Sequence, residues 1–158
     1  MSYQHIFKAA IAWQLKAGTS TQNPKTFSRN HKVKIDNIKD VLEVSAAKMF
    51  HGDPALYNPE DLLLSALASC HMMSYLYVCA QHNIQVVSYN DNAEAYLNVA
   101  YSGRGQFTKA QLNPVVTIKH ADKQTLALSL HKQANSLCFI ANSCNFPITH
   151  QAKIIIAK

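Results

Sequence analysis

The chain has 158 residues, of which 48% are hydrophobic and 15% are charged, and its formal net charge is +6. This length favours one compact domain, and we expect a single domain over residues 1–158. The basic balance raises the question of nucleic acid, but the lysines are dispersed and the arginines are limited to Arg29 and Arg104. Nucleic-acid surfaces use arginine heavily, so we expect no nucleic-acid partner.

The sequence also predicts a cytoplasmic protein. It shows no uninterrupted apolar run of about 20 residues, the length needed to span a bilayer, and its start lacks the layout of a signal peptide. Four cysteines in a chain with a large core do not indicate a secreted disulfide scaffold. The cysteines and the eight histidines lack the spacing of zinc ligands. We therefore expect no membrane partner, no metal and no cofactor.

The first third of the chain predicts an antiparallel meander of three strands. Apolar and polar residues alternate over residues 7–15 and again over residues 27–36, and a third short strand follows near residues 41–47. In the second of these, Arg29, His31, Val33 and Ile35 share one face. This pattern places Arg29 on the apolar side of its strand.

A long helix is predicted over residues 58–81. Asn58 suits the N-cap, Pro59 the first helical position, and Glu60 and Asp61 the positive end of the helix dipole. Apolar residues fall on nearly every side, which is typical of a buried helix. Such a helix needs cover on both sides, so we expect a partner helix or a second subunit to pack against it.

The rest of the chain reads as a second β-α-β portion, which makes the fold class α+β. Strands are expected at 84–99 and 111–120, around a loop at Gly103 and Gly105. Asp122 is expected to cap a second helix, whose apolar residues continue to Ile140 at three- and four-residue spacings. The segment AKIIIAK predicts a closing strand.

Cys70 is the residue that suggests chemistry. A cysteine is most often a small buried hydrophobe, which is how we interpret Cys79, nine positions further along the same helix and on its opposite side. A thiolate in an apolar setting, however, needs a cation, and Arg29 on its apolar face is the candidate. An inward arginine in turn needs a carboxylate, which Glu60 offers.

Two segments resemble a known family. N-P-E-D-L-L-L-S-A-L-A-S-C, in which Cys70 stands ten positions after Glu60, is similar to the signature of the OsmC/Ohr family (osmotically inducible protein C and organic hydroperoxide resistance protein). In S-L-C-F-I-A-N-S, Cys138 matches the second cysteine of that family, and Arg29 matches an arginine upstream. The resemblance covers nearly the whole chain and implies an OsmC-like fold in an intertwined homodimer.

The resemblance also implies an activity, the thiol-dependent reduction of organic hydroperoxides. Cys70 would attack the peroxide and become a sulfenic acid, Cys138 would condense with it to a disulfide, and a dithiol, of lipoyl type in the Ohr branch, would reduce the pair. Arg29 would stabilise the thiolate, and Glu60 would orient Arg29. Ten helical residues rise about 15 Å, so we hypothesise that Glu60, alone or together with Arg29, serves Cys70 of the other subunit.

Some positions depart from the peroxidase branch. Phe139 follows Cys138 where proline is common, and His71 follows Cys70 where an apolar residue is expected, which makes the chain closer to the broad OsmC-like group. For Cys144 we expect a structural role, with a competing resolving thiol as the alternative. His31 and His51 are interpreted as surface residues, with a place at the mouth of the site as the alternative.

Two functions of other classes stay open beside the peroxidase. In the first, a non-catalytic dimer binds an apolar ligand or senses oxidation through Cys70. In the second, a structural dimer presents its basic surface to a partner. An inert thiol with bound lipid-like material would mark the former, and association that weakens with salt would mark the latter.

Overall fold

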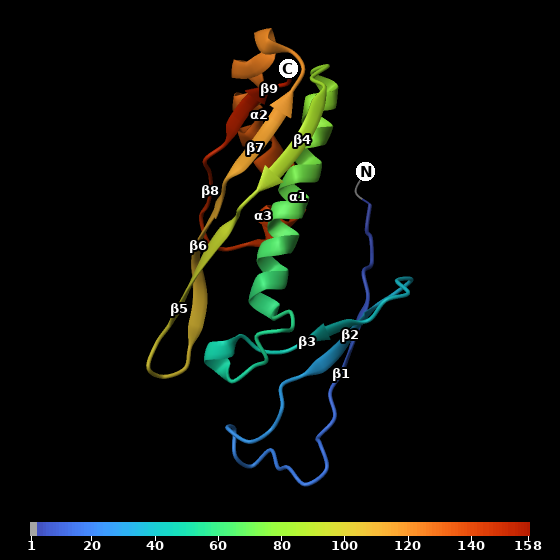
Figure 1. The fold of residues 1–158 in the computed structure, drawn as a ribbon, viewed down its shortest axis with the longest axis vertical. Helices are drawn as coiled ribbons and strands as arrows, with labels where there is room; N and C mark the ends of the chain where they lie inside the picture. Colours follow the sequence, from blue (N-terminus) through green and yellow to red (C-terminus); the bar gives the residue numbers. More distant parts are fainter. Residues whose placement is uncertain (1–2) are drawn as a thin grey trace. The chain divides into compact units, whose positions relative to one another are not determined.

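The computed structural model describes residues 3–158 and has the mixed α+β composition predicted from the sequence (Figure 1). The chain divides into two compact units, which meet in sequence between Leu62 and Leu63. The prediction of a single domain stays a prediction.

The first unit contains the predicted meander. Strands β1 (Ala9–Ala12), β2 (His31–Ile35) and β3 (Leu42–Val44) pair antiparallel in the order β1-β2-β3, and a 3₁₀ turn, η1 (Lys48–Phe50), follows. Ala9 lies opposite Ile35 in the β1–β2 pair, and His31 lies opposite Val44 in the β2–β3 pair.

The placement of Arg29 within a strand was wrong. The β1–β2 ladder ends at the pair of Ala12 and Lys32, so β2 begins two residues after Arg29. Beyond that pair, the indole Nε1–H of Trp13 donates to the carbonyl of Ser28 over 2.8 Å. A side-chain hydrogen bond thus takes the place of further backbone pairing, and Arg29 lies in the segment that leads into the strand.

Helix α1 (Pro59–Gln81) has the predicted bounds. The backbone N–H of Asp61 donates to Asn58 Oδ1 over 2.9 Å, and Asn58 Nδ2 donates to Asp61 Oδ2 over 2.6 Å. Asn58 therefore satisfies one of the free N–H groups of the first turn, as an N-cap does. Glu60 and Asp61 both lie in that turn, at the positive end of the helix dipole.

Within the second unit α1 is covered on one side. Its buried residues recur every three or four positions; they are Leu67, His71, Tyr75, Val78 and Cys79. On the other side, Met73 and Tyr77 are 58% and 59% exposed. Contrary to expectation, α1 is long and apolar enough to cross a membrane by length and composition alone, a test that the core helix of a soluble protein also passes. The buried stripe identifies α1 as such a core helix.

Two three-stranded sheets make up the β-structure of the second unit. One contains β4 (Val86–Asp91), β7 (Pro114–Ile118) and β9 (Lys153–Ile156) in the order β4-β7-β9; Figure 1 shows β7 between its neighbours. The other contains β5 (Glu94–Val99), β6 (Gly105–Leu112) and β8 (Ile148–His150) in the order β5-β6-β8. The closing strand β9 was predicted, whereas β8 was missed.

The predicted strand over residues 84–99 is interrupted, because side chains replace backbone pairing in its middle. Asp91 Oδ1 accepts from the backbone N–H of Asn113 over 2.7 Å, and Asn113 Nδ2 donates to the carbonyl of Asn92 over 2.8 Å. Pro114, which has no N–H to donate, follows at once. The interruption therefore falls at the same place in both halves of the hairpin. It separates β4 from β5 in the first half and β6 from β7 in the second.

The second helix also differs from its prediction. A 3₁₀ turn, η2 (Ala121–Lys123), leads into α2 (Gln124–Leu137), so Asp122 is not its cap; Lys123 holds that position without a capping side chain. The helix stops at Cys138, whose backbone is extended (φ −74°, ψ 109°), and a separate short helix, α3 (Phe139–Ser143), follows.

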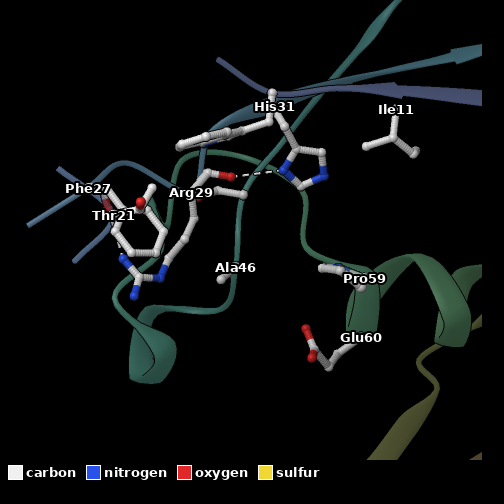
Figure 2. Close-up of a pocket in the computed structure, with 10 residues that line it drawn as sticks. Ile11, Thr21, Phe27, Arg29, His31, Ala46, Pro59 and Glu60 are labelled. Carbon is white, nitrogen blue, oxygen red and sulfur yellow. Dashed lines mark hydrogen bonds between the residues drawn. The ribbon is translucent and has the colours of Figure 1, made fainter. Parts of the chain in front are cut away.

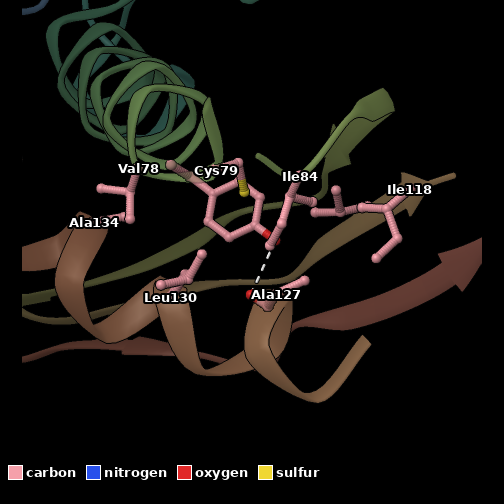
Figure 3. Packing of buried hydrophobic residues seen from close by; sticks show 9 residues of the cluster. Val78, Cys79, Ile84, Ile118, Ala127, Leu130 and Ala134 are labelled. Carbon is pink, nitrogen blue, oxygen red and sulfur yellow. Dashed lines mark hydrogen bonds between the residues drawn. The ribbon is translucent and has the colours of Figure 1, made fainter. Parts of the chain in front are cut away.

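The larger core cluster of the second unit lies where α1 and α2 pack on β7 (Figure 3). Its buried members are Tyr75, Val78, Cys79, Ile84, Val116, Ile118, Ala127, Leu130 and Ala134. The hydroxyl of Tyr75 donates to the carbonyl of Ala127 over 3.0 Å, the dashed line in Figure 3. This bond satisfies the polar end of an otherwise apolar side chain.

Candidate functional site

A pocket of about 450 Å³ lies in the first unit (Figure 2). Its walls come from β1, β2, the segment after β3 and the start of α1; the lining residues are Ile11, Trp13, Thr21, Phe27, Arg29, His31, Ser45, Ala46, Pro59 and Glu60. Two of the four predicted site residues, Arg29 and Glu60, thus line one pocket. Most of its wall is apolar, which suits an organic ligand.

Aromatic side chains fix the shape of this wall. The rings of Trp13 and Phe27 meet edge to face, with centroids 6.0 Å apart and an angle of 77° between their planes. The hydrogen bond from Trp13 to Ser28 holds the indole in place. Such pairs gain from the ring quadrupoles in addition to buried area.

Arg29 is half-buried and bound to its own segment. Its guanidinium donates to the carbonyl of Phe27 over 2.8 Å and to the carbonyl of Pro24, and it lies 4.6 Å from the centroid of the Phe27 ring. The expected pairing of Arg29 with Glu60 is not formed. Within residues 3–158, the ion pair present joins Lys32 and Glu43 at 3.8 Å.

Glu60 lines the pocket with a buried polar atom that lacks a partner. Its Oε2 is buried without a hydrogen bond, and Figure 2 shows the carboxyl group apart from the guanidinium of Arg29. A buried carboxyl oxygen without a partner costs free energy. The pocket therefore offers an acceptor that a ligand or a moving cation would satisfy.

His31 and Ser45 belong to the pocket as well. His31 Nδ1 donates to the carbonyl of Arg29 over 2.8 Å, which fixes the orientation of the imidazole ring. Ser45 is fully buried; its hydroxyl donates to Asn30 Oδ1 over 2.8 Å and accepts from the N–H of Asp53 over 3.0 Å. His31 thus lines the pocket, in agreement with the alternative considered for it, a place at the mouth of the site. Ser45 was missed because a lone serine after a strand carries no signal of burial.

Gly52 supports the same segment through close backbone approach. Its N–H donates to the carbonyl of Ala47 over 3.2 Å, and a Cβ at this position would overlap the carbonyl of Ala46. Only glycine fits there. His51, just before it, is exposed and does not line the pocket.

The two predicted redox cysteines pack together in the second unit. Cys138 is fully buried in a cluster with Leu67, Ala110 and Leu112, and the half-buried Cys70 packs against this cluster. Burial, and then a hydrogen bond with the Cys70 side chain, raise the pKa of Cys138 to about 11. The N–H of Ala141 donates to Cys138 Sγ over 3.4 Å and lowers this pKa in part.

All four cysteines are free thiols. Cys79 is buried in the larger cluster of Figure 3, away from the cluster of Cys138, and burial raises its pKa. Cys144 is half-buried, and burial raises its pKa too. The opposite orientations predicted for Cys70 and Cys79 agree with their place in separate clusters.

A stack of three histidines includes His71, the residue after Cys70, and was not predicted. His71 is fully buried, its Nε2 lies 3.1 Å from His131 Nδ1, and its ring centroid lies 4.3 Å from that of His150. Burial, and then the neighbouring imidazoles, lower the pKa of His71 to about 3; burial and then His150 lower that of His131 to about 4. The three residues are far apart in sequence, and only the position of His131 on the buried face of α2 gave a usable signal.

The imidazole rings of these histidines stack on one another. Among residues 3–158, no group of three or more histidine, cysteine, aspartate or glutamate side chains is arranged to hold a metal ion. The Tyr75 ring continues the stack, with its centroid 3.9 Å from that of His131 and an angle of 12° between the planes. Neutral imidazoles pack on one another and on a phenol ring without a charge to desolvate.

The sequence and the fold of this chain are similar to those of known proteins. Residues 51–153 match the family model described as OsmC-like protein. An OsmC-like protein of unknown function from Vibrio cholerae is 30% identical, with a TM-score of 0.82, over 96% of this chain and all of the other. An organic hydroperoxide resistance protein from Elizabethkingia anophelis is 18% identical, with a TM-score of 0.67, over 99% and 100%.

A curated relative adds sequence similarity without an assigned activity. The uncharacterized protein YmaD of Bacillus subtilis is 26% identical over 121 residues, which are 73% of this chain and 79% of YmaD. The matched family model spans well over half of the chain, including α1 from its first residue to its last. This chain belongs to the OsmC-like protein family.

Proposed function

We propose that the protein reduces organic hydroperoxides, with Cys70 as the attacking thiol and Cys138 as the resolving thiol. The observation that carries this proposal is the packing of Cys70 against the cluster that contains Cys138, where both thiols are free and the Cys70 side chain affects the pKa of Cys138. A peroxidase of this kind needs two thiols that can form a disulfide without large movements. The neighbour from Elizabethkingia anophelis, named for organic hydroperoxide resistance, supports the same class of reaction.

The reaction balances with these two thiols and one dithiol. The Cys70 thiolate attacks one peroxide oxygen of ROOH, the O–O bond breaks, and the alkoxide takes a proton and leaves as ROH, so that Cys70 becomes a sulfenic acid. The Cys138 thiol then displaces water from this sulfenic acid, and a disulfide forms. A dithiol reductant exchanges with that disulfide, becomes a disulfide itself and restores both thiols.

The environment of Cys138 suits the second step better than the first. Burial raises the pKa of Cys138, so only a small fraction of its thiols is ionised at pH 7. Only the thiolate attacks a peroxide, so Cys138 competes poorly for the substrate. It stays a protonated thiol beside Cys70 until the sulfenic acid forms.

Arg29 and Glu60 complete the proposed site. Arg29 stabilises the thiolate of Cys70, and Glu60 accepts a hydrogen bond from Arg29 once the guanidinium turns from the carbonyls of Phe27 and Pro24. The unsatisfied Oε2 of Glu60 supports such a turn. Because α1 is uninterrupted and ten residues of helix rise about 15 Å, Glu60 serves Cys70 of a second subunit.

A homodimer is part of the proposal. Met73 and Tyr77, on the uncovered side of α1, are more than half exposed in the single chain, and burying such apolar surface stabilises association. The apolar wall of the pocket favours an organic peroxide over hydrogen peroxide. We assign the protein to the cytoplasm, where thiols stay reduced, with a lipoyl-type dithiol as reductant.

Steady-state turnover tests this function. The purified protein is mixed with cumene hydroperoxide and either dihydrolipoamide or glutathione, and loss of peroxide is followed. We expect turnover with the dithiol that exceeds turnover with glutathione, and that disappears in Cys70→Ser but not in Cys144→Ser. Equal rates for the wild type and Cys70→Ser would contradict the proposal.

The second candidate is a binding module that uses the same pocket. The pocket favours it by its apolar wall of Ile11, Trp13 and Phe27 and by its room for a ligand of moderate size. This function predicts apolar material carried through purification, and thiols that peroxide leaves unchanged. Mass spectrometry of an organic extract, beside the turnover assay, separates the two functions.

A further inference from the structure

His31 lies at the boundary between two pockets of the first unit. One is the apolar pocket of about 450 Å³ described above, and the other is a groove of about 490 Å³ whose lining is largely polar. The half-buried imidazole lines both. Lys32 and Glu43 line the groove with side chains that are 66% and 54% exposed, so water reaches it. His31 therefore stands between the space proposed for the peroxide and a source of protons.

A hydrogen bond to the backbone determines which nitrogen of His31 can exchange its proton. Nδ1 lies 2.8 Å from the carbonyl oxygen of Arg29. A carbonyl oxygen only accepts, so Nδ1 carries a proton in both the neutral and the charged ring. Gain and loss of a proton are thus confined to Nε2. Figure 2 shows this second ring nitrogen directed away from the carbonyl of Arg29.

The reduction of a hydroperoxide requires a group of this kind. The alkoxide RO⁻ is a poor leaving group until its oxygen receives a proton, and a positioned acid that supplies the proton speeds this step. Histidine is the side chain that exchanges a proton between about pH 5 and pH 8. Of the other polar groups in the pocket, Arg29 retains its protons and Glu60 is an acceptor in the proposed site. The hydroxyl of Ser45 already donates to Asn30.

We propose that His31 is the acid that protonates the leaving alkoxide. This inference rests on the proposed reduction of organic hydroperoxides and supplies the proton which that reaction needs. As the Cys70 thiolate attacks and the O–O bond breaks, the Nε2 proton of the His31 imidazolium passes to the alkoxide oxygen, and ROH leaves. The ring is then neutral and keeps its Nδ1 proton on the carbonyl of Arg29. Water in the groove returns a proton to Nε2.

Two oxidants that differ in their leaving group test this role. tert-Butyl hydroperoxide releases an alkoxide that needs a proton, whereas peracetic acid releases a carboxylate that does not. The rate constant for oxidation of Cys70 in the reduced full-length protein is measured by rapid quenching and peptide mapping. His31→Asn retains a side-chain N–H for the carbonyl of Arg29 and removes the acid. We expect it to slow the reaction with tert-butyl hydroperoxide about a hundredfold and that with peracetic acid less than about threefold.

Controls separate this role from structure and from the proposed function. His51→Asn changes an exposed histidine outside the pocket and should alter both rates less than about twofold. In His31→Ala, added imidazole should raise only the rate with tert-butyl hydroperoxide. Equal slowing with both oxidants, or no slowing in His31→Asn, would overturn the role of His31 and leave the proposed function standing. A wild-type Cys70 that neither oxidant modifies would overturn the proposed function itself.

Discussion

Helix α1 carries two cysteines whose surroundings differ. Cys79 is buried among aliphatic and aromatic side chains in the larger core cluster, and burial raises its pKa. Cys70, nine residues earlier, is half-buried and packs against the second thiol of Cys138. Residue type and helix are the same in both cases. The difference therefore lies in access and in the neighbour, which make one thiol structural and the other a candidate for redox chemistry.

The largest expected effect is on catalysis. Cys70→Ser should lower kcat/KM for cumene hydroperoxide at least roughly a thousandfold, about 4 kcal/mol of transition-state stabilisation, because the nucleophile is lost. Cys79→Ala should change kcat/KM less than about threefold, since Cys79 has no second thiol beside it. Peroxide loss measured for both purified variants checks the contrast, and comparable losses of activity would break it.

The histidine stack links the two cysteine sites, because His71 follows Cys70 and His131 packs on Tyr75, beside Cys79. The pKa of His71 is lowered to about 3 and that of His131 to about 4, from 6.5 in the unfolded chain. Below pH 6.5 the unfolded state binds protons that the folded state does not, so stability is present above pH 6.5 and is lost as the pH falls toward 4. Each histidine should remove about 2 kcal/mol from the free energy of unfolding between pH 7 and pH 5.

Urea unfolding at a series of pH values measures this loss. The exposed His120 provides the control, since His120→Gln should leave the slope of stability against pH unchanged. A free energy of unfolding that stays constant between pH 7 and pH 5 would show that the stacked imidazoles are not held neutral by burial.

Removing the proposed resolving thiol, Cys138, tests whether its presence beside Cys70 distinguishes Cys70 from Cys79. Cys138→Ser should reduce steady-state turnover about a hundredfold, because the Cys70 sulfenic acid then waits for an external thiol. A single turnover of peroxide should persist and leave one added oxygen on Cys70. Cys144→Ser is the matched control. A larger reduction of steady-state turnover in Cys144→Ser than in Cys138→Ser would assign the resolving role to Cys144.

The smallest effect concerns the structural site. Tyr75→Phe removes the hydrogen bond to the carbonyl of Ala127 near Cys79 and should lower the free energy of unfolding by about 1 kcal/mol. Tyr101→Phe alters a fully exposed tyrosine away from α1 and should change the free energy of unfolding by less than about 0.5 kcal/mol. Thermal unfolding of both variants measures the difference, and equal stabilities would contradict the importance of this bond.

Local patterns in the sequence were sufficient for part of the fold. Asn58 and the residues after it predicted the start of α1, because capping and dipole effects act within one turn. Alternation predicted the first two strands of the meander, and the segment AKIIIAK predicted β9. The break between β4 and β5 was missed because it depends on Asn113, about twenty residues away, whose side chain replaces backbone pairing. Long-range substitutions of this kind leave no periodic signal.

Of the candidate site, too, the sequence predicted only some features. Spacing along α1 and the motif around Cys138 pointed to the cysteine pair, and the structure brings the two thiols together. The pairing of Arg29 with Glu60 did not follow, since Arg29 binds the carbonyls of its own loop. The stack of His71, His131 and His150 was missed because tertiary packing alone assembles it.

The most direct test of the account is intact-mass spectrometry of the reduced protein after one equivalent of cumene hydroperoxide, followed by peptide mapping, with Cys70→Ser as control. We predict a loss of two hydrogens that maps to a disulfide between Cys70 and Cys138, with Cys79 unchanged. An unreacted protein, or oxidation of Cys79 and Cys144 as readily as of Cys70, would contradict the assignment of Cys70 and Cys138 as the redox pair.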